Sequence, residues 1–254
     1  MDTPVHVEQS DGVQIITINR PEVRNAINTE TAVAIAAALE ELDARDDLVA
    51  GVVTGAGKTF CTGMDLKAFL AGERPSVEGR GFAGITEKSS DKPIIAAVEG
   101  HAVAGGFEIV LACDLVVASE TAVFGLPEVK RGLLAGGGGL LRLPRKVPHQ
   151  LAVEWSLTGE YFTAHTAYEA KLLNRLVPEG QALAEAVALA KAIAKNGPLA
   201  VRATKQIIAQ ARDWSNDEEF ERMREIYEPV RSSADAKEGA LAFKEKREPV
   251  WQGR

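Results

Sequence analysis

The sequence contains few residues of the kinds that build disulfide frameworks or metal centres. Only two cysteines, Cys61 and Cys113, and four histidines are spread over 254 residues, with no Cys-x-x-Cys or paired Cys/His spacing. A disulfide-bonded secreted fold and a metal site are therefore not expected. The chain also lacks an apolar run of the roughly 18 residues that a membrane span needs, and its N-terminus has no signal-peptide pattern. We expect a cytoplasmic protein that does not bind membranes.

Motifs for nucleotide binding and for a serine nucleophile are also missing. The segment Gly51 to Thr59 resembles a phosphate loop, but Val52 stands where the first glycine is required. The run Gly136 to Gly139 lacks the preceding strand and the later acidic residue of a dinucleotide fingerprint, and no Gly-x-Ser-x-Gly occurs. The net charge of -7 argues against a general nucleic-acid surface, although a local basic patch could still hold an anionic ligand. NAD, ATP and nucleic acids are therefore not expected.

The first half of the sequence alternates short apolar strands with amphipathic helices. The pattern predicts strands at Val13 to Asn19, Val49 to Thr54, Ile94 to Val98 and Leu115 to Ala118, and helices at Thr29 to Arg45 and Ala104 to Ala112. Thr29 is the expected N-cap of the first helix. Such alternation indicates an α/β core with parallel strands and right-handed crossovers.

The pattern becomes helical after about Gly139. Helices are predicted at Leu140 to Leu157, Thr163 to Leu172, Ala182 to Lys195, Leu199 to Arg212, Asp217 to Val230 and Ala234 to Lys246. Residues 72–91 are polar and rich in glycine, so we expect a mobile loop or a loose helix there.

Two glutamates flank a short strand-like run, and each has a neighbourhood suited to chemistry. Gly105 and Gly106 open the helix that carries Glu108, and a glycine-rich helix start exposes free N–H groups to a ligand. Such N–H groups could stabilise an oxyanion, and Glu108 falls on the same helical face as Gly105. The alternative explanation is that the Gly-Gly pair only permits tight packing and that Glu108 is a solvated helix residue. Taken alone, the segment favours this alternative.

Glu128 follows a proline and enters a mostly apolar run, where desolvation would raise its pKa and suit acid/base work. Its alternative explanation is a helix-start glutamate that the helix dipole favours.

Cys61 has no legible partner and is expected to be a small buried residue. His101 also lacks a partner, so a structural or pocket-lining role is predicted.

Read together, these segments resemble the crotonase superfamily of enoyl-CoA hydratases and isomerases. The resemblance covers essentially the whole chain, in order. The matching runs are Asn19-Arg20-Pro21 with Asn25-Ala26, Phe60 to Leu66, Lys92 to Asp114, Phe124 to Glu128, Gly138 to Pro144, Leu157-Thr158-Gly159, Asn174 to Pro178 and Ala242 to Arg247.

The resemblance implies a spiral of ββα units over residues 1–195 and a helical oligomerisation region over residues 196–254. It also implies homotrimers, or hexamers built as dimers of trimers, and an acyl-CoA substrate with no further cofactor. Carried over by position, the oxyanion hole would be the N–H groups of Met64 and Gly105, and the catalytic pair would be Glu108 and Glu128. Substrate and CoA contacts would come from Arg24, Ala26, Lys58, Gly63, Asp65, Leu66, Gly106, Phe243 and Lys246, the last two reaching the nucleotide end, in one reading from a neighbouring subunit.

Retention of both glutamates favours a hydratase or dehydratase that adds or removes water across the 2,3 double bond of an acyl-CoA thioester. Phe107 and the C-terminal run Pro249 to Arg254 look more like the carnitinyl-CoA dehydratase branch of the superfamily. Two other functions stay open: a different crotonase reaction such as double-bond isomerisation, and non-catalytic acyl-CoA binding.

Overall fold

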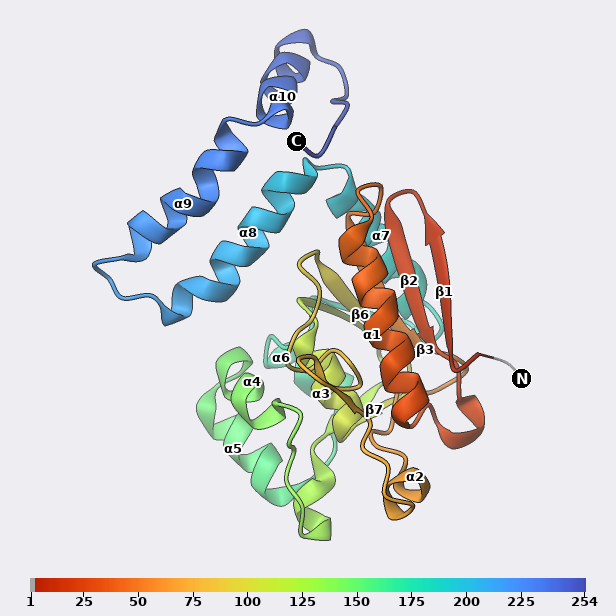
Figure 1. The fold of residues 1–254 in the computed structure, drawn as a ribbon. Coiled ribbons are helices and arrows are strands. Elements are labelled where there is room, and N and C mark those ends of the chain that lie inside the picture. Colours follow the sequence, from red (N-terminus) through yellow and green to blue (C-terminus); the bar gives the residue numbers. More distant parts are fainter. Residues whose placement is uncertain (1–2) are drawn as a thin grey trace.

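The computed structural model describes residues 3–254. Its centre is a six-stranded sheet in the order β1-β2-β3-β6-β8-β11 (Figure 1). The strands are β1 (Val5–Ser10), β2 (Val13–Ile18), β3 (Ala50–Gly55), β6 (Ile94–Val98), β8 (Leu115–Ser119) and β11 (Arg175–Val177). β1 pairs with β2 antiparallel, and every other pairing in this sheet is parallel. The predicted parallel α/β core is confirmed, with β1 and β11 as additional edge strands.

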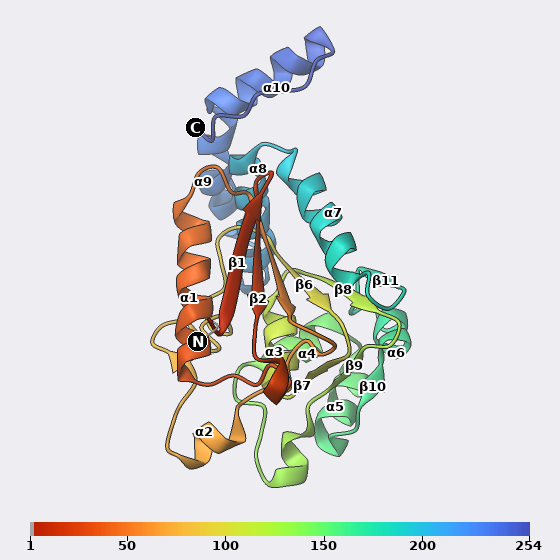
Figure 2. The same ribbon diagram turned by 90° about the vertical axis from the view of Figure 1, so that its right-hand side faces the viewer.

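Two helices cover opposite faces of this sheet. Side chains alternate between the two faces along each strand, and both faces are apolar, so each face packs against a helix. On β6, Ile94 and Ala96 pack with the core that includes α1 (Thr29–Ala44), whereas Ile95 and Ala97 pack with α7 (Ala182–Ala194). Figure 2 shows α1 and α7 on either side of the strands. The N-cap of α1 is Asn28, whose side chain accepts the N–H of Thr31, so the prediction of Thr29 as the cap was wrong by one residue.

A second, smaller sheet contains two strands that come directly after β6 and β8 in the chain. It consists of β7 (His101–Val103), β9 (Val123–Gly125) and β10 (Phe162–Thr163), in the order β10-β9-β7. Two short helices pack against this sheet: α3 (Gly105–Ala112) against β7, and α6 (Ala164–Glu169) against β9 and β10. The other short elements are α2 (Leu66–Leu70) and the 3-10 turns η1 (Pro21–Val23) and η2 (Pro127–Arg131). β7 and β9 are parallel, so the turns that follow them lie at the same edge.

Residues 72–91 differ from the expected mobile loop or loose helix. They contain a two-stranded hairpin of β4 (Ser76–Val77) and β5 (Gly81–Phe82). The segment that follows the hairpin packs closely against α1 at Gly84. A Cβ at this position would lie 2.5 Å from the carbonyl oxygen of Ala32 on α1, so a residue with a side chain would not fit. Arg80 is buried and donates to the carbonyl of Gly84, which fixes the turn after β5.

The predicted helix from Leu140 to Leu157 is two helices, α4 (Gly139–Lys146) and α5 (His149–Thr158). Pro148 causes the break, because a residue before proline is driven out of the helical region and Val147 is extended.

The last three helices, α8 (Pro198–Gln210) followed by η3 (Ala211–Asp213), α9 (Glu219–Arg231) and α10 (Ala234–Glu245), extend beyond the sheet (Figures 1 and 2). Lys205 fastens α8 to the core by donating to Asp114 and to the carbonyls of Ser90 and Lys92. The division at residues 195 and 196 stays a prediction.

Within the described residues, no helix is long and apolar enough to cross a membrane.

Candidate active site

The start of α3 leaves backbone N–H groups free at a point where glycine is required. A Cβ on Gly105 would lie 2.5 Å from the Phe82 ring, and one on Gly106 would lie 2.1 Å from the carbonyl oxygen of Cys61. Ala104, just before them, adopts φ 52°, a strained value for a residue with a side chain. In the part of the chain that the structure describes, the Gly105 N–H has no acceptor. It is therefore available to a ligand.

A second free N–H comes from the loop between Cys61 and Asp65. Ile27 pairs with both neighbours of Met64: its N–H donates to Gly63 (2.8 Å) and its carbonyl accepts from Asp65 (2.9 Å). The N–H of Met64 therefore points away from Ile27, and it has no acceptor among residues 3–254. A Cβ on Gly63 would lie 2.9 Å from the nitrogen of Gly105, so the two glycine backbones are in close contact. The two segments that carry the predicted oxyanion donors are therefore in contact.

Glu108 is buried one helical turn after Gly105 and is only 4% exposed. Its Oε1 accepts the N–H of Gly139 at 2.9 Å, and a Cβ on Gly137 would lie 2.7 Å from Oε2. The glycine run therefore allows its backbone to approach this carboxyl closely. Burial raises the pKa of Glu108, and hydrogen bonds from Gly139 and Gly137 oppose the rise. The explanation of Glu108 as a solvated helix residue is wrong.

Arg142 holds the glycine run in place from behind. Its guanidinium donates to the carbonyl of Gly137 at 3.3 Å and to the carbonyl of Thr86, which follows the β4–β5 hairpin. One side chain thus links Glu108's glycine loop to the hairpin that carries Phe82.

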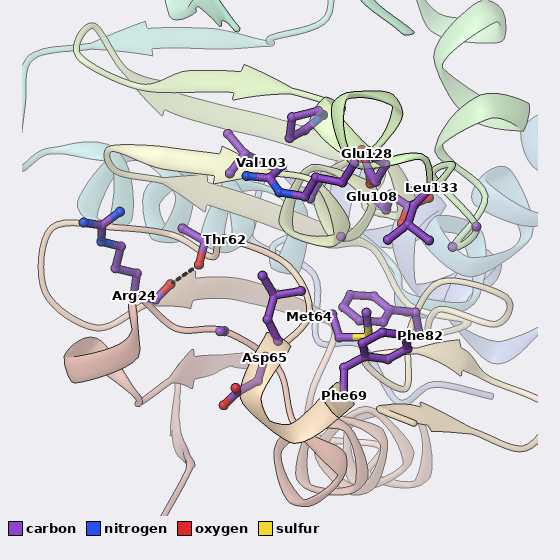
Figure 3. A pocket seen from close by; sticks show the side chains of 18 of the residues that line it. Arg24, Thr62, Met64, Asp65, Phe69, Phe82, Val103, Glu108, Glu128 and Leu133 are labelled. Carbon is purple, nitrogen blue, oxygen red and sulfur yellow. Dashed lines mark hydrogen bonds between the residues drawn. The ribbon is translucent and has the colours of Figure 1, made fainter. Parts of the chain in front are cut away.

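Glu128 lies in η2, directly after β9, and its carboxyl shares the cavity with Glu108 (Figure 3). Burial, reinforced by the nearby Glu108 carboxylate, raises the pKa of Glu128 to about 7. Its Oε2 is buried and has no hydrogen-bond partner within the described residues. A buried carboxyl oxygen without a partner can accept or donate a proton to a bound molecule.

The two carboxyls and both free N–H groups open into one cavity of about 790 Å³. Of the predicted contact residues, Arg24, Ala26, Met64, Asp65, Leu66 and Gly105 line it, as does His101. The Asp65 carboxylate caps α2 and pairs with Arg20 at 3.0 Å, so its role is to shape the wall. Cys61 is buried, which raises its pKa to about 12 and makes it a poor nucleophile.

The other predicted contacts do not reach the cavity. Gly63 and Gly106 are packed behind it, Lys58 lies in the turn after β3, and Phe243 and Lys246 belong to the end of α10, far from this cavity within one chain (Figure 1).

No local sequence pattern identified several further lining residues, because α2, the hairpin, η2 and the residues just before β10 come together only in the folded chain. These residues are Phe69, Phe82, Glu87, Arg131, Leu133, Leu134 and Tyr161. No group of three or more His, Cys, Asp or Glu side chains within residues 3–254 could hold a metal ion.

Comparison with known proteins gives a consistent result. The sequence pattern of the enoyl-CoA hydratase/isomerase family matches residues 8–254. The chain is 42% identical to Enoyl-CoA hydratase EchA19 of Mycobacterium tuberculosis, covering 98% of this chain and 96% of the relative. It is 39% identical to Carnitinyl-CoA dehydratase of Salmonella enteritidis over the full length of both. The crystal structure of enoyl-CoA hydratase EchA1 from Mycobacterium marinum superimposes with a TM-score of 0.98 at 53% identity over both whole chains. The fold expected from the resemblance is confirmed.

Proposed function

The chain belongs to the enoyl-CoA hydratase/isomerase family, and from that premise we propose that Glu108 and Glu128 add or remove water at the 2,3 double bond of an acyl-CoA thioester. It is a hydratase-type lyase that acts on acyl-CoA. The observation that supports the residue assignment is one cavity lined by Glu108, by Glu128 and by the residues of two backbone N–H groups that have no acceptor among residues 3–254.

The proposed mechanism uses one proton shared by the two carboxyls. In hydration, the ionised Glu108 accepts a proton from a water molecule as the water oxygen bonds to C3. The protonated Glu128 gives its proton to C2, so a hydroxyl and a hydrogen are added and the carboxyl pair retains one proton. The thioester oxygen carries negative charge during the step, and the N–H groups of Met64 and Gly105 stabilise it. Dehydration runs through the same states in reverse.

The cavity wall also suggests where CoA lies. Arg24 and Lys67 line it in a protein of net charge -7, and both cations are suited to the phosphates of the nucleotide. Ala26 and Leu66 line the adjoining wall and are proposed to contact the pantetheine or adenine. The absence of a cofactor beyond substrate CoA stays a prediction, as does the cytoplasmic location.

Isotopic water separates hydration from the nearest alternative reaction. With a 2-enoyl-CoA in H₂¹⁸O, we expect a 3-hydroxyacyl-CoA that carries the heavy oxygen at C3. A 3-enoyl-CoA that yields the 2-enoyl isomer without heavy oxygen would instead identify an isomerase. Binding of acyl-CoA without turnover of either substrate would identify a binding protein.

The shared proton predicts a bell-shaped pH profile for kcat/KM. Because hydration needs Glu128 protonated, and its pKa is about 7, the rate falls as the pH rises above this value. The acid limb reports protonation of Glu108, and both limbs belong to the coupled pair. Steady-state rates measured from about pH 5 to 9 test this; a profile without an alkaline limb would rule out Glu128 as the proton donor.

We also propose that the chain assembles as a homotrimer or a dimer of trimers. Large apolar side chains are exposed along the three C-terminal helices, with Ile208 67%, Phe220 61% and Phe243 88% exposed. Such surface is typical of subunit contacts. Light scattering should give at least three times the 27.1 kDa chain mass, and a monomeric mass would contradict the proposal.

A further inference from the structure

The catalytic cavity has two chemically different ends, separated by Met64. Figure 3 shows Arg24 and Thr62 on one side of Met64 and Phe69 and Phe82 on the other, with Leu133 beside Glu108 and Glu128. The first end presents a guanidinium and a hydroxyl that already bonds the Arg24 carbonyl. The second end presents phenyl rings and branched aliphatic chains. This polarity matches a ligand that is charged at one end and apolar at the other.

The apolar end is lined by two groups of side chains, which we call its walls. Phe69 on α2 and Phe82 on β5 form one wall, and Leu133 and Leu134, which follow η2, form the other. Phe82 also covers the oxyanion donor Gly105, so this end begins where the thioester carbonyl would lie. The acyl carbons beyond C3 would therefore enter between these walls.

Parts of both walls are exposed to water. Phe69 is 44% exposed, Leu133 48% and Leu134 65%, although all three line the cavity. Removing such apolar surface from water is favourable, and exposed apolar rims mark ligand grooves. A butenoyl group would end near the glutamates and leave these rims in water, whereas a longer hydrocarbon would cover them.

We propose that this protein is built for acyl-CoA thioesters with a long or bulky hydrocarbon acyl group, which the apolar end binds. This inference rests on the proposed function, because it places the thioester at Gly105 and Met64. A cationic acyl group is the competing class, since two phenyl rings and the Glu87 carboxylate also lie here. Leu133 and Leu134 favour the hydrocarbon, because aliphatic side chains offer a cation no attraction, and Glu87 is exposed to water.

Binding and turnover are measured separately so that the two proposals can fail separately. Calorimetry with saturated butanoyl-, octanoyl- and dodecanoyl-CoA gives affinity without chemistry, and the matching 2-enoyl-CoA series gives kcat/KM. A fully buried methylene is worth about fourfold in affinity. Because the walls stay partly open, we expect roughly tenfold tighter binding of octanoyl- than butanoyl-CoA, with a parallel rise in kcat/KM.

Substituting an exposed wall residue by serine tests the contribution of the walls to acyl-chain binding, and the chain offers a matched control. Phe69→Ser and Leu134→Ser should each lower the ratio of dodecanoyl to butanoyl affinity by about threefold to tenfold. The control is Leu70→Ser, because Leu70 is 85% exposed on the same helix as Phe69 and does not line the cavity, so its ratio should equal that of the wild type.

Three results would overturn the inference: affinity that stays level or falls with chain length, equal ratios in all three variants, or tighter binding of a trimethylammonium-bearing acyl-CoA than of dodecanoyl-CoA. A chain-length dependence of affinity that the wall variants abolish supports the inference even if no thioester is hydrated, and in that case only the proposed reaction fails.

Discussion

Replacing Glu128 with glutamine lowers the hydration rate of a 2-enoyl-CoA by about 10²- to 10⁴-fold and leaves acyl-CoA binding largely intact. Glutamine keeps the size of the side chain but cannot give a proton to C2. Glu108→Gln has a loss of the same order, because the amide cannot accept a proton from water, and the Gly139 N–H keeps an acceptor only if the amide oxygen faces it. Steady-state rates with calorimetric binding of a saturated acyl-CoA separate the two effects.

Glu120→Gln is the control for this pair, because Glu120 is an exposed carboxylate directly after β8 and does not line the cavity. It should keep wild-type kinetics. Near-normal hydration by either Glu108→Gln or Glu128→Gln would refute the shared-proton mechanism.

Glu128→Gln should also increase the stability of the folded protein. If Glu128 had a purely structural role, the same substitution would decrease that stability. The folded-state pKa of about 7 lies above the ordinary value of 4.5, so the folded protein holds this proton more tightly than the unfolded chain. The carboxyl therefore contributes stability at low pH, and this contribution is lost as the pH rises through 7. We expect Glu128→Gln to melt above the wild type at about pH 8, with the difference shrinking toward pH 4.

Local sequence patterns predicted those parts of the fold and of the site that depend only on residues close together in the sequence. Strand periodicity located β2, β3, β6 and β8, and helical spacing placed Glu108 one turn from Gly105. Glu128 could be assigned to the same site only through the family resemblance, because the parallel pairing of β7 and β9 joins two segments twenty residues apart.

The rest of the site depends on long-range packing that no local pattern encodes. Phe82 belongs to a polar, glycine-rich stretch, and it becomes a cavity wall because the hairpin packs on α1 and Arg142 bonds the Thr86 carbonyl. The apolar identity of Phe82 could be read from the sequence, but its position over Gly105 could not. For the same reason the acyl group could not be inferred before the walls were in place.

Gly63→Ala should reduce kcat by about 10²- to 10³-fold, the loss typical of removing one oxyanion donor. The added Cβ would lie 2.9 Å from the nitrogen of Gly105 and 3.0 Å from the Cβ of Ala104, so the backbone segments that carry the two donors must move apart. Substrate affinity should change less than kcat, because the negative charge on the thioester oxygen develops only in the transition state.

Gly72 provides a matched control for the backbone strain in this experiment. Gly63 has φ +91° and Gly72 has φ +90°, so alanine is conformationally unfavourable at both positions by a similar amount. A Cβ on Gly72 would meet nothing within 4 Å, so Gly72→Ala should show only the part of the stability loss that comes from backbone strain and should keep the wild-type kcat. Thermal unfolding and single-turnover rates of the two variants separate strain from the displaced donors. Equal kcat values for the two would mean that the N–H groups of Met64 and Gly105 do not hold the thioester oxygen, whatever the glutamates do.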